Sequence, residues 1–153
     1  MFENIRRALC HLLKCEGDEW LSITYTREYD VNEVLTILRA EFGHEFNLFL
    51  SDAKYKSIPK EVLEEILAYD TTDLYRYISE YFDCDDFSYR LMGQLSTPDY
   101  GALTFGIAWV STGRGGHALN VFIDDEENVW MVEPQNDKIF KFPEDWTMAL
   151  IVM

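Results

Sequence analysis

A series of short apolar runs in the second half of the sequence constrains the fold more than any other feature. After Pro98 these runs are rich in β-branched and aromatic residues, and Gly, Asp or Asn residues separate them. Such runs and separators are typical of antiparallel strands joined by short turns. The sequence therefore predicts an antiparallel β-meander over residues 98–153, with strands at residues 103–110, 117–123, 129–134, 139–142 and 148–152.

Apolar residues at helical spacing dominate the first part of the chain, residues 1–97. Asp30 followed by Glu33 resembles a capping box, and Pro59 suits the first turn of a helix. The order of helices and then sheet indicates an α+β fold, and the length favours a single domain over residues 1–153. The spacing predicts helices over residues 2–17, 31–42, 57–67, 72–82 and 84–95, a strand or irregular segment at residues 20–26 and a buried connection at residues 46–51.

The composition excludes some classes of partner. The 153 residues include 48% hydrophobic residues and carry a net charge of −15. Since phosphate binding needs a surplus of Lys and Arg, this charge argues against nucleic acid as a partner. The sequence shows neither an apolar run of about 18 residues nor a signal peptide, so we expect no membrane contact and a cytoplasmic location. Three cysteines, an odd number, favour reduced thiols over a disulfide framework.

Cys84 lies where a helix is expected to begin. Asp83 is a preferred N-cap residue, and Asp85 and Asp86 fall in the first turn, where carboxylates suit the helix dipole. A thiol in this place is either inert packing or a nucleophile. Backbone amides and a nearby imidazolium favour the reactive thiolate, whereas the flanking carboxylates oppose it. A nucleophilic role for Cys84 therefore requires a histidine nearby.

His117 and Glu133 lie on two strands that are expected to be neighbours. If the turn between these strands has an odd number of residues, Val121 pairs with Val129 and His117 with Glu133. An even-numbered turn would pair His117 with Pro134 instead. Only the odd-numbered turn keeps the apolar residues of both strands on one face. This register predicts a hydrogen bond between the imidazole and the carboxylate, directly or through water.

Together, the thiol, the imidazole and the carboxylate are the groups that acyl transfer by a cysteine requires. The imidazole takes the proton of the thiol, and the carboxylate orients the imidazole and supports its charge. Glycines before the histidine leave room for an extended substrate backbone. The expected site therefore has Cys84, His117 and Glu133 as catalytic residues and Gly115, Gly116, Trp109 and Gln135 as substrate-binding residues.

Three segments carry a resemblance to a known family. They are Cys-Asp-Asp-Phe at residues 84–87, Gly-His-Ala-Leu-Asn at 116–120 and Trp-Met-Val-Glu-Pro-Gln at 130–135. In this order they resemble the Cys, His and Glu motifs of the papain-like cysteine-protease domain at the C-terminus of a mushroom agglutinin and of related small bacterial and phage proteins. The resemblance implies a papain-like fold with Cys84 as nucleophile, His117 as base and Glu133 as orienting acid.

The sequence departs from this pattern in two respects. Papain-type enzymes carry a glutamine about six residues before the nucleophile to complete the oxyanion hole, and Ile78 occupies that position. The chain is also shorter than a full papain domain. We expect no metal and no cofactor, but the fungal relative depends on calcium, and the acidic residues around Cys84 keep a calcium site as an alternative.

Two functions agree with these residues. The first is a cysteine hydrolase, a peptidase or amidase, that acts on a peptide or isopeptide bond of a protein or of cell-wall peptide. The second is a catalytically idle papain-like binding module of a phage or mobile-element protein, in which Trp109, Trp130 and Trp146 matter more than Cys84. The order of Cys, His and Glu favours the hydrolase, whereas the carboxylates beside the thiol favour the binding module. The oligomeric state stays open.

Overall fold

The structure is a computed structural model that describes residues 24–97 and 100–153. The first expected helix and most of the segment at residues 20–26 lie outside these residues. The described elements are β1 (Arg27–Asp30), α2 (Val31–Phe42), β2 (Asn47–Phe49), β3 (Lys54–Ser57), α3 (Lys60–Tyr69), η1 (Thr72–Leu74), α4 (Cys84–Leu95), β4 (Phe105–Thr112), β5 (Gly115–Ile123), β6 (Val129–Glu133), β7 (Lys138–Phe140) and β8 (Thr147–Val152).

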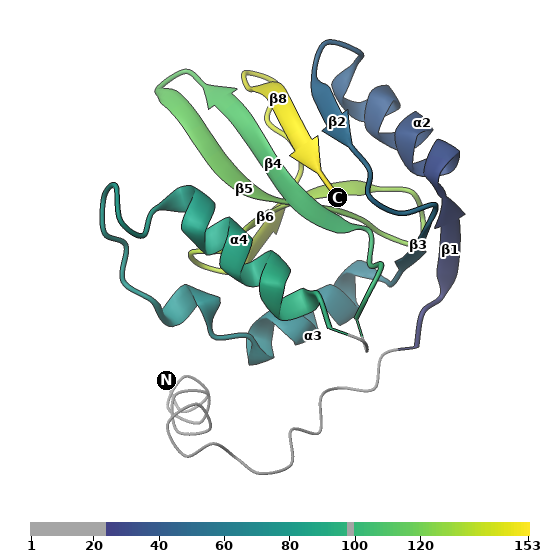
Figure 1. The fold of residues 1–153 in the computed structure, drawn as a ribbon, viewed down its shortest axis with the longest axis horizontal. Coiled ribbons are helices and arrows are strands. Elements are labelled where there is room, and N and C mark those ends of the chain that lie inside the picture. The colour runs from purple at the N-terminus through teal and green to yellow at the C-terminus, as the bar shows by residue number, and fades with distance from the viewer. Residues whose placement is uncertain (1–23, 98–99) are drawn as a thin grey trace.

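A six-stranded sheet forms the centre of the fold (Figure 1). Its strand order is β2-β8-β4-β5-β6-β7, and β2 runs parallel to β8 while the other neighbours are antiparallel. The predicted meander is therefore wrong, because β8 lies between β2 and β4 instead of beside β7. Apolar alternation identifies a strand but does not name its neighbour.

The first part of the chain, where we expected mainly helices, also contains the strands β1, β2 and β3. Strands β1 and β3 pair with each other in a small antiparallel sheet, and β2 joins the central sheet. In β2 the side chains of Asn47 and Phe49 are exposed, so residues 46–51 are an edge of the sheet and not the buried connection that we expected. These strands have three or four residues each, which is too short for a clear alternation of apolar and polar positions.

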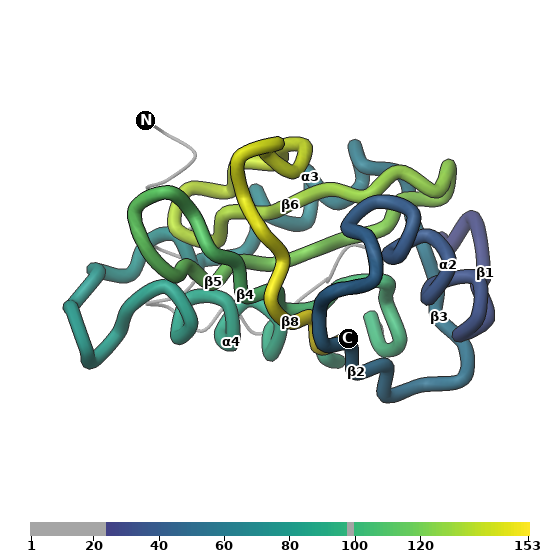
Figure 2. Tube along the Cα trace, turned by 90° about the horizontal axis from the view of Figure 1, so that it is seen from above, coloured from purple at the N-terminus to yellow at the C-terminus, as the bar shows by residue number. Residues whose placement is uncertain are grey.

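Helices pack on both faces of the central sheet. On one face, Val34 and Leu38 of α2 pack with buried residues of β4, β5, β6 and β8, including Val121 of β5. On the other face, α3 and α4 pack against a second cluster that includes Phe122. Figures 1 and 2 show α4 along β4 and β5. Val121 and Phe122 are consecutive, so their side chains point to opposite faces of the sheet. Strand β5 therefore contributes apolar side chains to both clusters.

Helix α2 begins where the capping box predicts. The Asp30 carboxylate accepts hydrogen bonds from the backbone N–H groups of Asn32 and Glu33, at 2.7 and 3.0 Å. The Glu33 carboxylate accepts one from the N–H of Asp30, at 2.8 Å. These bonds satisfy N–H groups that have no partner within the helix, which fixes its first residue.

Residues 72–82 do not form the helix that their spacing predicts. Only η1 is helical, and a backbone hydrogen bond of 2.8 Å from Phe82 to Ile78 closes a turn. Glu80 within this turn has a φ of 65°, which is incompatible with a right-handed helix. The segment therefore runs as an irregular connection to α4.

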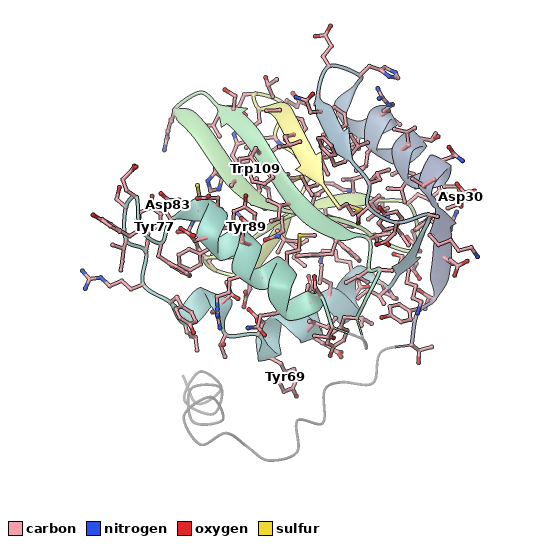
Figure 3. All side chains as sticks on the ribbon, in the orientation of Figure 1. Asp30, Tyr69, Tyr77, Asp83, Tyr89 and Trp109 are labelled. Carbon is pink, nitrogen blue, oxygen red and sulfur yellow. The ribbon has the colours of Figure 1, made fainter. Side chains whose placement is uncertain are left out.

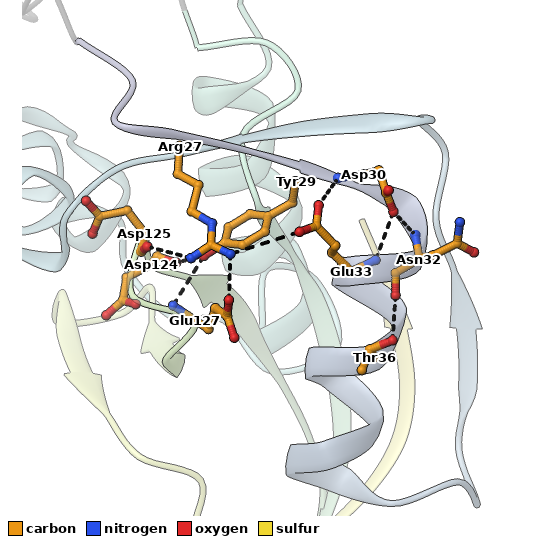
Figure 4. A network of polar contacts seen from close by, with 9 residues as sticks. All are labelled: Arg27, Tyr29, Asp30, Asn32, Glu33, Thr36, Asp124, Asp125 and Glu127. Atoms are coloured by element: carbon orange, nitrogen blue, oxygen red, sulfur yellow. Dashed lines mark hydrogen bonds and ion pairs between the residues drawn. The ribbon is translucent and has the colours of Figure 1, made fainter.

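A network of polar contacts ties β1 to the turn between β5 and β6 (Figure 4). The Tyr29 side chain is buried, and its hydroxyl donates a hydrogen bond of 2.7 Å to the backbone carbonyl of Asp124. The Arg27 guanidinium donates to the Glu127 carboxylate at 2.5 Å. Contacts between residues almost a hundred positions apart hold the small sheet against the large one.

Asn120 joins α4 to the sheet. Its buried side-chain amide donates hydrogen bonds of 3.1 Å to the carbonyls of Ser88 in α4 and Gly106 in β4. Gly106 is required at its position, because a Cβ atom there would lie 2.4 Å from the carbonyl oxygen of Val152. The amide of Asn120 therefore sets how α4, and with it Cys84, lies on the sheet.

We predict that Asn120→Ala lowers the free energy of unfolding by about 1–3 kcal/mol, because two buried carbonyls lose a donor. Chemical denaturation measures this change. Asn32→Ala, at an exposed position of α2, is the matched control and should change the free energy by less than about 0.5 kcal/mol. Equal effects of the two substitutions would contradict the role of the Asn120 amide.

Candidate functional site

Cys84 is the first residue of α4, as the sequence predicts, and its thiol is free and half-buried. The Asp86 carboxylate accepts a hydrogen bond of 3.1 Å from the N–H of Asp83, which fixes the start of the helix. The Ser88 hydroxyl donates to the carbonyl of Cys84 at 2.8 Å. Local sequence thus places the thiol at the positive end of the helix dipole.

Two carboxyl groups flank this thiol, and their pKa values shift in the directions expected of a pair that shares a proton. A hydrogen bond between the side chains lowers the pKa of Asp83 and raises the pKa of Asp85, and burial adds to the rise for Asp85. One ligand atom each from Asp83, Cys84 and Asp85 lie within 4.8 Å of one another. Two carboxylates and a thiol are far fewer than the six to eight oxygen ligands that calcium takes. The expected absence of a metal and the calcium site kept as its alternative are both untested and stay predictions.

The shared proton can be tested by NMR titration of the carboxyl carbons. In Asp83→Asn we expect the pKa of Asp85 to fall toward its ordinary value, because the carboxylate that accepts its proton is gone. Asn also caps helices well, so α4 should persist. Since the pKa of Asp85 is raised and that of Asp83 lowered, the two groups contribute opposite pH dependences to stability. An unchanged pKa of Asp85 in Asp83→Asn would contradict the shared proton.

The turn between β5 and β6 sets the position of the next two site residues. The Asp124 carboxylate accepts hydrogen bonds from the N–H groups of Glu126 and Asn128, at 3.0 and 2.8 Å. This closes a five-residue turn with Ile123 opposite Val129. The odd-numbered turn is confirmed, but the predicted pairs are two residues out of register.

A shift of two residues keeps each side chain on its predicted face. His117 and Glu133 therefore still meet, as diagonal rather than direct neighbours. The Nε2 atom of His117 lies 2.8 Å from Oε2 of Glu133, and both side chains are largely buried. The predicted hydrogen bond between imidazole and carboxylate is confirmed.

Neighbouring groups hold this pair in place. The Gln135 side chain donates a hydrogen bond of 3.1 Å to the second oxygen of Glu133. The ring of Trp146 meets the His117 ring edge to face, with centroids 6.1 Å apart. Both carboxylate oxygens of Glu133 are thus engaged, so hydrogen bonds on both sides orient this carboxylate.

The thiol and the imidazole come from different faces of the sheet. By alternation His117 lies on the side of Leu119, whose cluster includes α2, whereas α4 packs on the opposite side. Contact between the thiol and the imidazole, and the catalytic roles of Cys84, His117 and Glu133, stay predictions.

The other residues singled out from the sequence lie in different surroundings. Trp109 is half-buried and meets the Tyr89 ring, with centroids 5.9 Å apart. Gly115 and Gly116 are exposed at the start of β5. Trp130 donates a hydrogen bond of 2.7 Å to Asp124, so it supports the turn on the far side of the molecule. A substrate-binding role for Gly115, Gly116, Trp109 and Gln135 stays a prediction.

The structure has an exposed tyrosine surface beside Cys84, which we did not predict from the sequence. We define it as Tyr75, Tyr77, Tyr81 and Tyr89, whose exposed fractions are 40, 49, 83 and 53%. Figure 3 shows Tyr77 beside Asp83, and Tyr89 on α4 toward Trp109. Desolvation raises the pKa of the Tyr77 phenol, and the charges of Asp83 and Cys84 raise it further. Tyr77 of the tyrosine surface therefore lies beside the start of α4.

Solved structures share this fold. A structure of PSL1a in complex with E64 has a TM-score of 0.74 and 24% identity, over 82% of this chain and 51% of that chain. A second structure is the crystal structure of Polyporus squamosus lectin bound to the human-type influenza-binding epitope Neu5Acα2-6Galβ1-4GlcNAc. It has a TM-score of 0.72 and 24% identity, over 82% of this chain and 49% of that chain. The chain thus shares a fold with these two proteins, and it spans about half the length of these solved chains.

A sequence-family comparison gives the particular family. The model described as agglutinin C-terminal matches residues 55–139, which is more than half of the chain. The chain belongs to the agglutinin C-terminal family. The matched residues include Cys84, His117 and Glu133. No curated protein matches the chain.

These comparisons confirm one prediction and overturn others. The resemblance to an agglutinin C-terminal domain is confirmed, whereas the papain-like fold and the cysteine-hydrolase function are wrong, because the matching family and structures are those of agglutinins and lectins. The comparisons therefore do not support a peptide or cell-wall substrate. Three reactive residue types in a given order do not define a fold, because their order says nothing about how the strands between them pair.

No helix in the described residues combines the length and the apolar character that crossing a membrane requires. The expected lack of contact with nucleic acid stays a prediction, as does the cytoplasmic location.

The reactivity of Cys84 can be measured by alkylation with iodoacetamide at pH 7. We expect Cys84 to react faster than Cys10 and Cys15 in the same chain, because backbone amides at the helix start favour the thiolate. In His117→Ala the rate at Cys84 should fall, while the rates at the other two stay the same. Mass spectrometry of the peptides gives all three rates. Equal rates at the three cysteines would contradict a special environment for Cys84.

Proposed function

We propose that this domain binds glycans through the tyrosine surface and the acidic residues at the start of α4. The supporting observation is the exposure of aromatic side chains in one part of the molecule. Of the eight large hydrophobic residues described as exposed, six lie between Leu74 and Tyr89. Soluble proteins seldom leave such a concentration uncovered unless it meets a partner.

Tyrosine suits a sugar as a ligand. A pyranose ring has faces formed by C–H groups and an edge of hydroxyl groups. The C–H groups pack against the electron-rich face of an aromatic ring, and the phenol hydroxyl can exchange hydrogen bonds with the sugar. Tyrosine also loses little conformational entropy on binding, since it has two side-chain torsions. Tyr77, beside Asp83, and Tyr89, on α4, offer such rings (Figure 3).

The acidic residues beside the rings favour a neutral glycan. Carboxylates accept hydrogen bonds from sugar hydroxyls, and charged acceptors form the stronger bonds. The net charge of −15 and the carboxylates at Asp83, Asp85 and Asp86 repel an anionic sugar. The lectin with the similar fold binds a sialylated glycan, Neu5Acα2-6Galβ1-4GlcNAc. For this chain we propose a preference for neutral glycans such as the Galβ1-4GlcNAc part.

We predict that the chain binds Galβ1-4GlcNAc or another neutral member of a glycan array, and binds the sialylated trisaccharide more weakly. Titration of the best neutral glycan, followed by NMR, should shift signals of the tyrosine surface. In Tyr77→Ala and Tyr89→Ala the affinity should fall at least fivefold, since aromatic anchors are worth about 1 kcal/mol or more.

Tyr69→Ala is the matched control. Tyr69 is 59% exposed but lies at the end of α3, away from the other labelled tyrosines (Figure 3). Its substitution should leave the affinity unchanged. An array on which no neutral glycan binds, or equal losses in all three variants, would contradict the proposal.

A further inference from the structure

A cavity of about 280 Å³ lies at the opposite end of α4 from Cys84. Its walls come from four segments that are far apart in the sequence: the last turn of α4 with Ser96 and Thr97, the connection from Tyr100 to Phe105, the loop that follows β2, and Met153. The volume is just below the range of about 300–1,000 Å³ that is common for pockets of drug-sized ligands. The cavity suits a small molecule.

The inner part of this cavity is apolar. Leu95, Leu103 and Phe105 line it, and each is buried, with exposed fractions of 5, 6 and 4%. Met92 adds a flexible thioether side chain to the same wall. A ligand that enters must therefore carry an apolar body of a few carbon atoms.

The lining of the cavity also carries negative charge. Asp52, which is exposed, lines it, and its carboxylate accepts a long hydrogen bond of 3.3 Å from the Ser51 hydroxyl. The last turn of α4 faces the same space and contains no basic residue, so the negative end of the helix dipole is uncompensated there. The net charge of −15 strengthens this potential. These features favour a cation.

The wall of the cavity also contains strained backbone. Ala102 has a φ of 60°, a left-handed conformation that is costly for a residue with a side chain. A hydrogen bond of 2.6 Å from the N–H of Lys56 holds its carbonyl. At Gly101 a Cβ atom would lie 3.0 Å from the carbonyl oxygen of Thr97. Strain of this kind persists where surrounding contacts enforce it, and it gathers at ligand sites.

We propose that this cavity binds a small organic cation, a protonated amine on an apolar body, with the ammonium group at Asp52 and the body between Met92 and Phe105. An ammonium group donates three hydrogen bonds, which the carboxylate and the carbonyls of the last turn of α4 accept. This site is independent of the proposed glycan surface, because the two lie at opposite ends of α4.

Benzylamine, protonated at pH 7, is a suitable probe, and benzyl alcohol is its uncharged equivalent. In NMR titrations of the full chain we expect saturable shifts with benzylamine at residues around Met92, Leu103 and Asp52. Benzyl alcohol should bind at least fivefold more weakly. Equal binding of the two compounds, shifts confined to other surfaces, or no saturable shifts would overturn the proposal.

Variants separate the carboxylate from the apolar wall. Asp52→Asn should weaken benzylamine binding at least fivefold, whereas Glu61→Gln, which removes one exposed charge from α3, should leave it unchanged. Met92→Trp should fill the cavity and abolish binding, with thermal unfolding as the check that the chain is folded. Equal effects of Asp52→Asn and Glu61→Gln would show attraction by overall charge and would overturn the site.

Discussion

The buried carboxylate of Asp124 is the interaction on which the arrangement of the sheet depends. It accepts hydrogen bonds from the N–H groups of its own turn and from the indole of Trp130, at 2.7 Å. A buried carboxylate is costly unless donors surround it, so the path of the turn that supplies these donors is favoured. That path fixes the register of β5 and β6. The register in turn brings His117 to Glu133, and the carbonyl of Asp124 anchors Tyr29 of the small sheet.

Features that short segments decide could be predicted from the sequence. The capping box at Asp30 and the N-cap residue Asp83 place the starts of α2 and α4, because the bonds involved join residues three positions apart. The odd-numbered turn and the shared face of His117 and Glu133 follow from alternation alone. Features that distant segments decide could not be predicted. The insertion of β8 beside β2, and the two-residue shift of register, depend on which hydrogen bonds the folded chain can satisfy.

The site was predicted in part for the same reason. The pairing of His117 with Glu133 needs only alternation and a turn of odd length. The position of the Cys84 sulfur relative to the imidazole needs the three-dimensional path of α4, which the amide of Asn120 sets through bonds to Ser88 and Gly106. An ordered set of reactive residues therefore gave the correct family but the wrong chemistry, since fold and family do not fix function.

The failed helix prediction at residues 72–82 explains the tyrosine surface. As a helix, this segment would have turned Tyr75, Ile78 and Phe82 to the core together. In the structure a turn with Glu80 at positive φ breaks the helical periodicity of this segment. The ring of Phe82 packs on that of Phe87, with centroids 4.7 Å apart, while Tyr75 and Ile78 are exposed. Exposing these side chains loses part of the stabilisation that their burial would give. A segment that departs from its local structural preference and loses stability by doing so is expected to have a function. The irregular path of residues 72–82, which helical spacing did not predict, thus exposes aromatic rings that the proposed glycan binding uses.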